Sequence, residues 1–111
     1  MDRDLQERDW KLLRQVATVA LERFCGRVLR QAAAISNAPD KSNHERYLEL
    51  YQLMKEQDRD LASAFNDHRR STMLQKLAWI YSLGLLTEDE FGAFSEVTRE
   101  TALFLASHGR S

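Results

Sequence analysis

The sequence has few of the residues that interrupt helices or cross-link a chain. Its 111 residues include one cysteine, one proline and four glycines. The single cysteine, Cys25, excludes an intrachain disulfide and agrees with a reducing compartment. Long apolar runs are missing too, because no stretch approaches the roughly 18 residues of a membrane span, and the charged N-terminus is unlike a signal peptide. We therefore expect a cytoplasmic protein with no membrane contact.

The chain also lacks an excess of either charge. Sixteen basic and seventeen acidic residues leave a net charge of −1. No overall field draws such a protein to nucleic acid, so that role would need a local basic patch. Hydrophobic residues make up 43% and charged residues 30% of the chain, which is typical of a folded domain. This length and composition predict one domain over residues 1–111.

The remaining residues are mostly strong helix formers, and we predict an all-α bundle of about four helices. The first helix should run for about 30 residues, or about 45 Å, to Ser36. Its second half has an apolar arc too wide for one neighbour to cover, so we expect this helix to be the central helix of the fold.

The second helix should begin at about Asn43, after a turn-rich loop in which Ser42 and Glu45 form a capping pattern. The polar run 55–60 predicts that this helix either kinks or passes a place where the bundle offers no partner. We expect residues 55–70 to be irregular. A third helix should start at Met73, and a fourth should span about 88–108. The apolar stripe predicted for this last helix is Phe91, Phe94, Val97, Thr101, Phe104 and Leu105.

The junction between the last two helices has the strongest local signals in the chain. Gly84 supplies the left-handed position that closes a helix. Thr87 and Glu90 form a capping box for the next helix, and Leu86 is placed to pack on Phe91. These residues predict a C-terminal helical hairpin.

The sequence shows no motif for chemistry. It has no phosphate-binding glycine loop, no cysteine pair with metal spacing and no His-Glu-x-x-His pattern. Its three histidines are far apart in sequence, and Cys25 lies on the apolar arc of the first helix, where a buried structural thiol is favoured over a nucleophile. We expect no catalytic residues, no metal and no cofactor.

Two basic clusters and two tryptophans are the candidate interaction surface. Arg23, Arg27 and Arg30 share one face of the first helix, and Arg69 and Arg70 precede the third helix. Against DNA reading, the second helix of the C-terminal hairpin starts with three acids, which phosphate would repel.

Trp10 lies among charged residues in the part of the first helix that we expect to overhang the shorter helices. Trp79 either completes the core or belongs to an exposed patch, with the core favoured. The apolar arc and the overhang predict self-association through the first helix.

The function that the sequence favours is protein–protein association by a small non-enzymatic helical protein, in an adaptor or regulatory role and as a homodimer. One alternative is a nucleic-acid-associated regulator that uses the arginine clusters. The other is a helical bundle that binds a small ligand or a metal in a pocket between helices.

Overall fold

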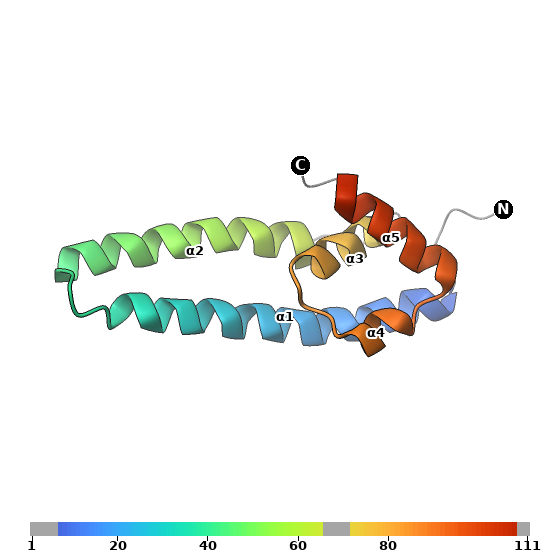
Figure 1. The fold of residues 1–111 in the computed structure, drawn as a ribbon, viewed down its shortest axis with the longest axis horizontal. Coiled ribbons are helices and arrows are strands. Elements are labelled where there is room, and N and C mark those ends of the chain that lie inside the picture. The colour runs from blue at the N-terminus through green and yellow to red at the C-terminus, as the bar shows by residue number, and fades with distance from the viewer. Residues whose placement is uncertain (1–6, 66–71, 109–111) are drawn as a thin grey trace.

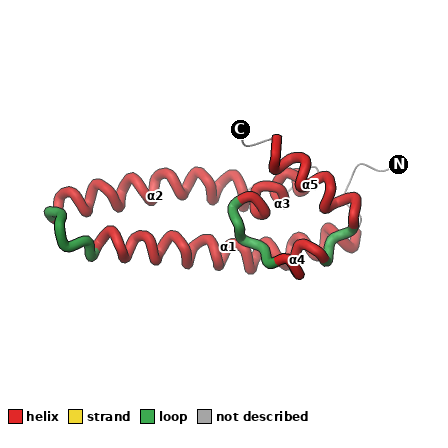
Figure 2. Tube along the Cα trace, viewed as in Figure 1, coloured by secondary structure: helices red, strands yellow, loops and turns green. Residues whose placement is uncertain are grey.

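The computed structural model describes residues 7–65 and 72–108, and within these ranges every regular element is a helix. The helices are α1 (Glu7–Ser36), α2 (Asn43–Phe65), α3 (Met73–Ser82), α4 (Glu88–Gly92) and α5 (Glu96–His108). The prediction of an all-α helical bundle is confirmed (Figure 2).

The protein has two parts: the base, made of α3, α4, α5, the end of α2 and α1 up to Val28, and the arm, which is the rest of the α1–α2 hairpin. The helices α1 and α2 form a long antiparallel hairpin, and α3, α4 and α5 gather at the end of it that holds the start of α1 (Figure 1). The molecule extends 58 × 24 × 21 Å, and its radius of gyration is 16.6 Å. A compact domain of this length has a radius of gyration of about 13 Å. The excess comes from the hairpin, which projects well beyond the other helices (Figure 1).

The core of the base follows one stripe of α1. The buried positions on this helix recur every three or four residues, as a single packed face requires. They are Asp9, Leu13, Val16, Ala20, Phe24 and Val28. Leu13 and Val16 pack with residues of α3 and α5, whereas Ala20 and Phe24 pack with the end of α2 and with α3. The stripe ends at Val28, eight residues before the helix does.

The rest of the hairpin has almost no buried residues. In α2, 23 residues long, only Ala64 and Phe65 are buried. We call residues 29–63, none of which is buried, the arm. The polar run 55–60 lies within α2 as unbroken helix, so the expected irregularity is wrong up to Phe65, and residues 66–70 lie outside the described part of the chain. We predicted that this run would either kink or pass a place where the bundle offers no partner, and the structure shows the second.

The predicted fourth helix is two helices, and its predicted apolar stripe is partly wrong. The helix is interrupted at residues 93–95, and α5 begins at Glu96. This break rotates α5, so that Thr98 and Ala102 are buried. Val97 and Phe104, which we expected in the core, are 67% and 60% exposed.

The long first helix is confirmed at 30 residues, but its overhang lies at the other end from the one we expected. The part of α1 up to Val28 is packed in the base, and the part after Val28 forms one side of the arm (Figure 1). Trp10 therefore belongs to the base.

Candidate interaction surface

Two of the predicted surface arginines hold the junction between α3 and α4. Arg23 donates hydrogen bonds to both carboxylate oxygens of Glu90, at 2.6 and 2.9 Å, and to the carbonyl oxygen of Leu85 at 2.8 Å. One turn further along α1, Arg27 donates to the carbonyl oxygen of Leu83 at 2.9 Å. The guanidinium groups thus satisfy carbonyl oxygens of the turn that follows α3.

Glu90 joins this arginine contact to the helix cap. Its carboxylate accepts from the backbone N–H of Thr87 at 2.9 Å, and its own N–H donates to the Thr87 hydroxyl at 3.1 Å. Gly84 has φ of 74°, so the predicted left-handed turn and capping box are both confirmed. The hydrogen bonds from Arg23 and from the Thr87 backbone lower the pKa of Glu90 to about 2.

The role that we expected for the arginine face, binding a partner or phosphate, stays a prediction. The structure places Arg23 and Arg27 in contacts within the chain, while Arg30 is exposed one turn further along α1, at the start of the arm. Arg69 and Arg70 lie outside the described residues. The described arginines of this face therefore do not form one open cationic patch.

A buried carboxylate at the other end of the base was not expected. Asp9 has no exposed surface, and it accepts hydrogen bonds from three groups at the start of α5. These are the Ser95 hydroxyl at 2.6 Å, the Thr98 hydroxyl at 2.6 Å and the Ser95 backbone N–H at 3.2 Å. Asp9 therefore caps α5 from another helix, where the helix dipole also favours a negative charge.

The environment of Asp9 keeps this carboxyl ionised. Burial raises its pKa, but the hydrogen bonds from Ser95 and Thr98 outweigh that effect and lower the pKa below its usual value. Arg8 adds a weaker attraction at 3.5 Å and donates to the carbonyl oxygen of Ala93 at 2.8 Å. The arrangement fixes the break between α4 and α5. Both carboxylate oxygens of Asp9 accept hydrogen bonds from Ser95 or Thr98, which is the geometry of a helix cap and not of a general base.

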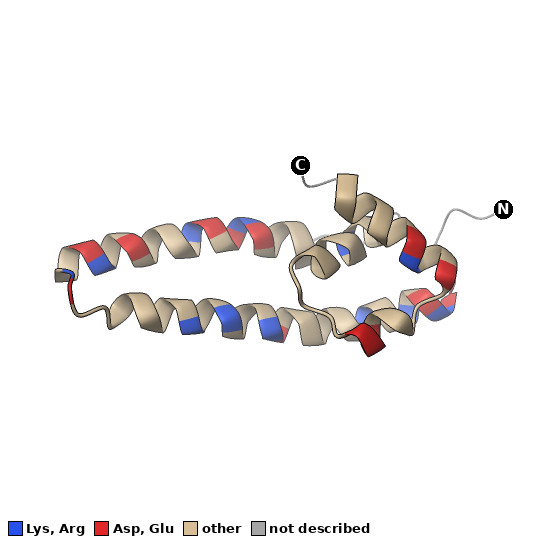
Figure 3. Ribbon diagram, in the orientation of Figure 1, with Lys and Arg blue, Asp and Glu red and all other residues tan. Residues whose placement is uncertain are grey.

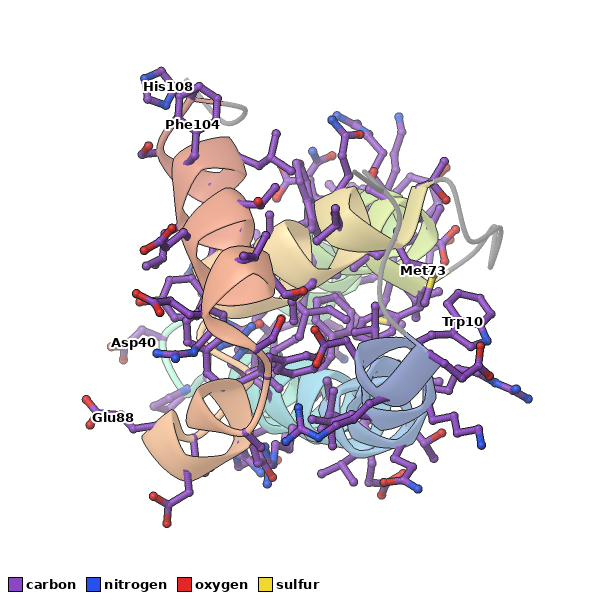
Figure 4. The ribbon with its side chains drawn as sticks, turned by 90° about the vertical axis from the view of Figure 1, so that its right-hand side faces the viewer. Trp10, Asp40, Met73, Glu88, Phe104 and His108 are labelled. Carbon is purple, nitrogen blue, oxygen red and sulfur yellow. The ribbon has the colours of Figure 1, made fainter. Side chains whose placement is uncertain are left out.

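The two tryptophans are half-buried and lie in different places. Trp10 packs against the Leu13 cluster, with the Arg14 guanidinium 6.0 Å from its ring centre. Figure 4 shows it beside Met73, on the side of the base away from α4. Trp79 packs against the second cluster, beside Leu83, which agrees with the favoured core position.

The largest group of exposed apolar side chains lies on the arm. Leu29, Tyr47, Tyr51 and Met54 are 64%, 67%, 60% and 46% exposed. The three on α2 are spaced by four and three residues, so they share one helix face. Leu29 and Met54 line the same hollow between the two helices, which places all four on one side of the hairpin. We call these four residues the arm face.

The hollow has a volume of about 270 Å³. Its lining is mainly apolar and consists of Phe24, Cys25, Val28, Leu29, Met54, Gln57, Asp58 and Leu61. On α1, Cys25 lies two residues after Arg23, and Leu29 lies two residues after Arg27. Two residues turn the helix by about 200°, so these side chains point to the opposite side from the arginines. The arm face therefore lies on the side of the hairpin opposite the α3–α4 junction.

Charge on the arm is unevenly divided. From Arg23 to its end α1 carries arginines and no acid, whereas α2 alternates acids and bases (Figure 3). Two charged residues of α2, Lys55 and Asp58, border the arm face, and within the described residues neither forms an ion pair. Glu56 between them accepts a hydrogen bond from Gln52 at 2.8 Å.

Comparison with known proteins adds no function to this geometry, because no family model, curated protein or solved structure matches the chain. Among the described residues, no cluster of three or more potential metal ligands occurs. Within the same residues, no helix is long and apolar enough to span a membrane. What the fold defines is a class, an elongated all-α protein with a packed base and an exposed helical arm.

Proposed function

We propose that this protein works by helix-mediated association, first with a second copy of itself, in an adaptor or regulatory role in the cytoplasm. The observation that carries the proposal is α2, most of which lies in the arm: this 23-residue helix buries only Ala64 and Phe65 while it exposes two tyrosines and a methionine on one face. A helix of this composition gains its stability mainly by packing an apolar face on a partner.

The amount of exposed apolar surface supports the proposal. A whole tyrosine has about 200 Å² of surface to bury. Tyr47 and Tyr51, at 67% and 60% exposed, therefore present on the order of 250 Å² to solvent, before Leu29 and Met54 are added. Contiguous apolar patches larger than a few hundred Å² are rare on soluble monomers, and the largest patch on such a protein is often functional.

The polar groups of the base support association over catalysis. Asp9, Arg23 and Glu90 each form two or more hydrogen bonds with a residue of another helix or of a turn, and all three stabilise turns between helices. Their partners are other side chains and backbone groups of the base. The arm carries the largest group of apolar side chains that the fold leaves exposed in the described part of the chain.

The test is the mass of the protein in solution. Light scattering coupled to size exclusion, over roughly 5–200 μM, should give a mass near twice 12.9 kDa. Leu29→Glu places a charge on the arm face and should give a monomer that keeps its helical circular-dichroism spectrum. The matched control is Leu103→Glu, because Leu103 is also an exposed leucine but lies on α5. A strict monomer for the wild type over the whole range, or equal effects of both variants, would sink the proposal.

A further inference from the structure

Lys55 and Asp58 form a self-complementary pair on the edge of the arm face. Both are exposed, they lie three residues apart on α2, and within the described residues each has no ion-pair partner. Asp58 also lines the hollow beside Met54 and Leu61. A basic and an acidic group at this spacing can be paired twice over by a single two-fold axis that passes between them.

We propose that a second copy of this chain docks antiparallel on the arm face, with Lys55 of each copy paired to Asp58 of the other. The inference rests on the proposed function and adds to it the partner's orientation and register. A two-fold axis that passes between residues 55 and 58 places the α2 helices of the two copies face to face and antiparallel. Tyr51 of one copy then lies opposite Ala62 of the other, a small exposed residue that leaves room for the ring.

Charge selects this orientation over a parallel one. In a parallel pair each residue faces its own copy, so Lys55 would lie against a second lysine and Asp58 against a second aspartate. Like charges in that position cost energy, whereas the antiparallel pair turns both contacts into attractions. The same charges also disfavour registers shifted by one helical turn, because such a shift separates the basic from the acidic group.

The area that this arrangement buries is enough for a specific dimer. Symmetric overlap about the axis covers α2 from Leu48 to Phe65, a length of about 27 Å at 1.5 Å per residue. Two helices side by side are about 20 Å wide, which gives about 540 Å² on each copy and about 1,100 Å² in total. Specific interfaces clear about 1,000 Å². The arm and the adjoining residues of α1 and α2 thus supply a dimer interface of the smaller kind.

The experiment is a charge swap, read by sedimentation equilibrium and native mass spectrometry of the full chain at about 50 mM salt. Lys55→Asp and Asp58→Lys each turn two attractions into two repulsions, and we expect each variant alone to dimerise at least about tenfold more weakly. When the two variants are mixed, the acid introduced at position 55 of one chain faces the lysine introduced at position 58 of the other. The second contact is the native pair of Lys55 and Asp58, so both contacts are attractive. The mixture should form the heterodimer in preference to either homodimer.

The double variant Lys55→Asp/Asp58→Lys should recover the wild-type dissociation constant for the same reason. The control is Glu56→Lys, which changes charge as Asp58→Lys does but lies about 160° away around α2, and it should leave dimerisation unchanged. Suppose that the wild type dimerises and Leu29→Glu disrupts the dimer, but the single charge variants do not weaken it and no heterodimer is preferred. That result would overturn this register and leave the proposed function standing. A wild-type chain that stays monomeric would remove both.

Discussion

Removal of the Asp9 carboxylate tests whether the base is held by its buried polar contacts. Asp9→Ala deletes the acceptor of three hydrogen bonds, from the Ser95 hydroxyl, the Ser95 N–H and the Thr98 hydroxyl. Net contributions of hydrogen bonds to charged groups are about 1.5–3 kcal/mol each. Part of that gain offsets the cost of burying the charge, so we expect a loss of about 3 kcal/mol in the free energy of unfolding.

This loss would be a large fraction of the total, because domains are stable by only about 5–15 kcal/mol. Urea unfolding followed by circular dichroism at neutral pH measures it. The matched control is Asp40→Ala, since Asp40 is an exposed aspartate in the loop between α1 and α2 and points away from the helices (Figure 4). We expect Asp40→Ala to change stability by less than about 0.5 kcal/mol.

The pH dependence gives a second test of the same contact. The folded-state pKa of Asp9 is below its ordinary value of 3.8, so the native state favours the ionised form. Its contribution is therefore complete above the unfolded-state pKa and is lost as the pH falls through the lower folded-state value. The stability gap between wild type and Asp9→Ala should be constant from about pH 5 to pH 7 and should shrink toward pH 3. Equal stability of Asp9→Ala and Asp40→Ala, or a gap that does not change with acid, would refute the argument.

Two further predictions concern the α3–α4 junction. Because contacts with Arg23 and Thr87 lower the pKa of Glu90 from 4.5 to about 2, Glu90→Gln should be less stable than wild type at neutral pH, and the gap should close as the pH falls from about 4.5 toward 2 in acid titrations followed by circular dichroism. Arg23→Ala should remove most of this pH dependence, and a gap that persists at low pH would contradict the assignment. Thr87→Ala removes the cap acceptor and should cost about 1 kcal/mol. Gly84→Val should cost more in thermal unfolding, because a branched residue is strained at φ +74° although nothing lies within 4 Å of the added carbon, and the reverse order would contradict the capping argument.

The parts of the fold that the sequence could predict depend on residues close together in the chain. The junction from Gly84 to Glu90 is an example, because its turn and its capping box involve neighbours within a few positions. The capping box of Ser42 and Glu45 at the start of α2 is another, with hydrogen bonds of 2.8 and 3.1 Å. Hydrogen bonds between near neighbours form these features, so the local sequence is enough to predict them.

The break between α4 and α5 could not be predicted in the same way. Ser95 is a reasonable cap residue, but its hydroxyl and N–H bond to Asp9, which is 86 residues away in the sequence. Continuous helical periodicity through Phe94 and Val97 pointed to one helix. One signal was present, because Asp9 stands in the same three- and four-residue spacing as the buried positions Leu13 and Val16. A charged residue on the core stripe of a helix indicates a buried polar partner elsewhere.

The candidate surface shows a similar limit. Spacing correctly placed Arg23 and Arg27 on one helix face, but it says nothing about what lies against that face. In the structure the carbonyl oxygens of Leu83 and Leu85 and the Glu90 carboxylate lie there. A charge pattern on one helix cannot distinguish an internal anchor from an open binding site, because both need the same residues at the same spacing.

The division of labour along α1 is the main argument for where function lies. Up to Val28, α1 packs its apolar stripe in the base, and its charged residues Asp9 and Arg23 form hydrogen bonds there. After Val28 the helix buries no residue, and α2 opposite it buries none before Ala64. A chain that needed only a stable base could end this hairpin near Val28. Ordering the residues of the arm costs about 1–2 kcal/mol each in backbone entropy, and the contacts between two helices with no buried side chain return little of it. A partner on the arm face supplies the missing burial, and this makes the arm face the first surface on which to look for the activity of the protein.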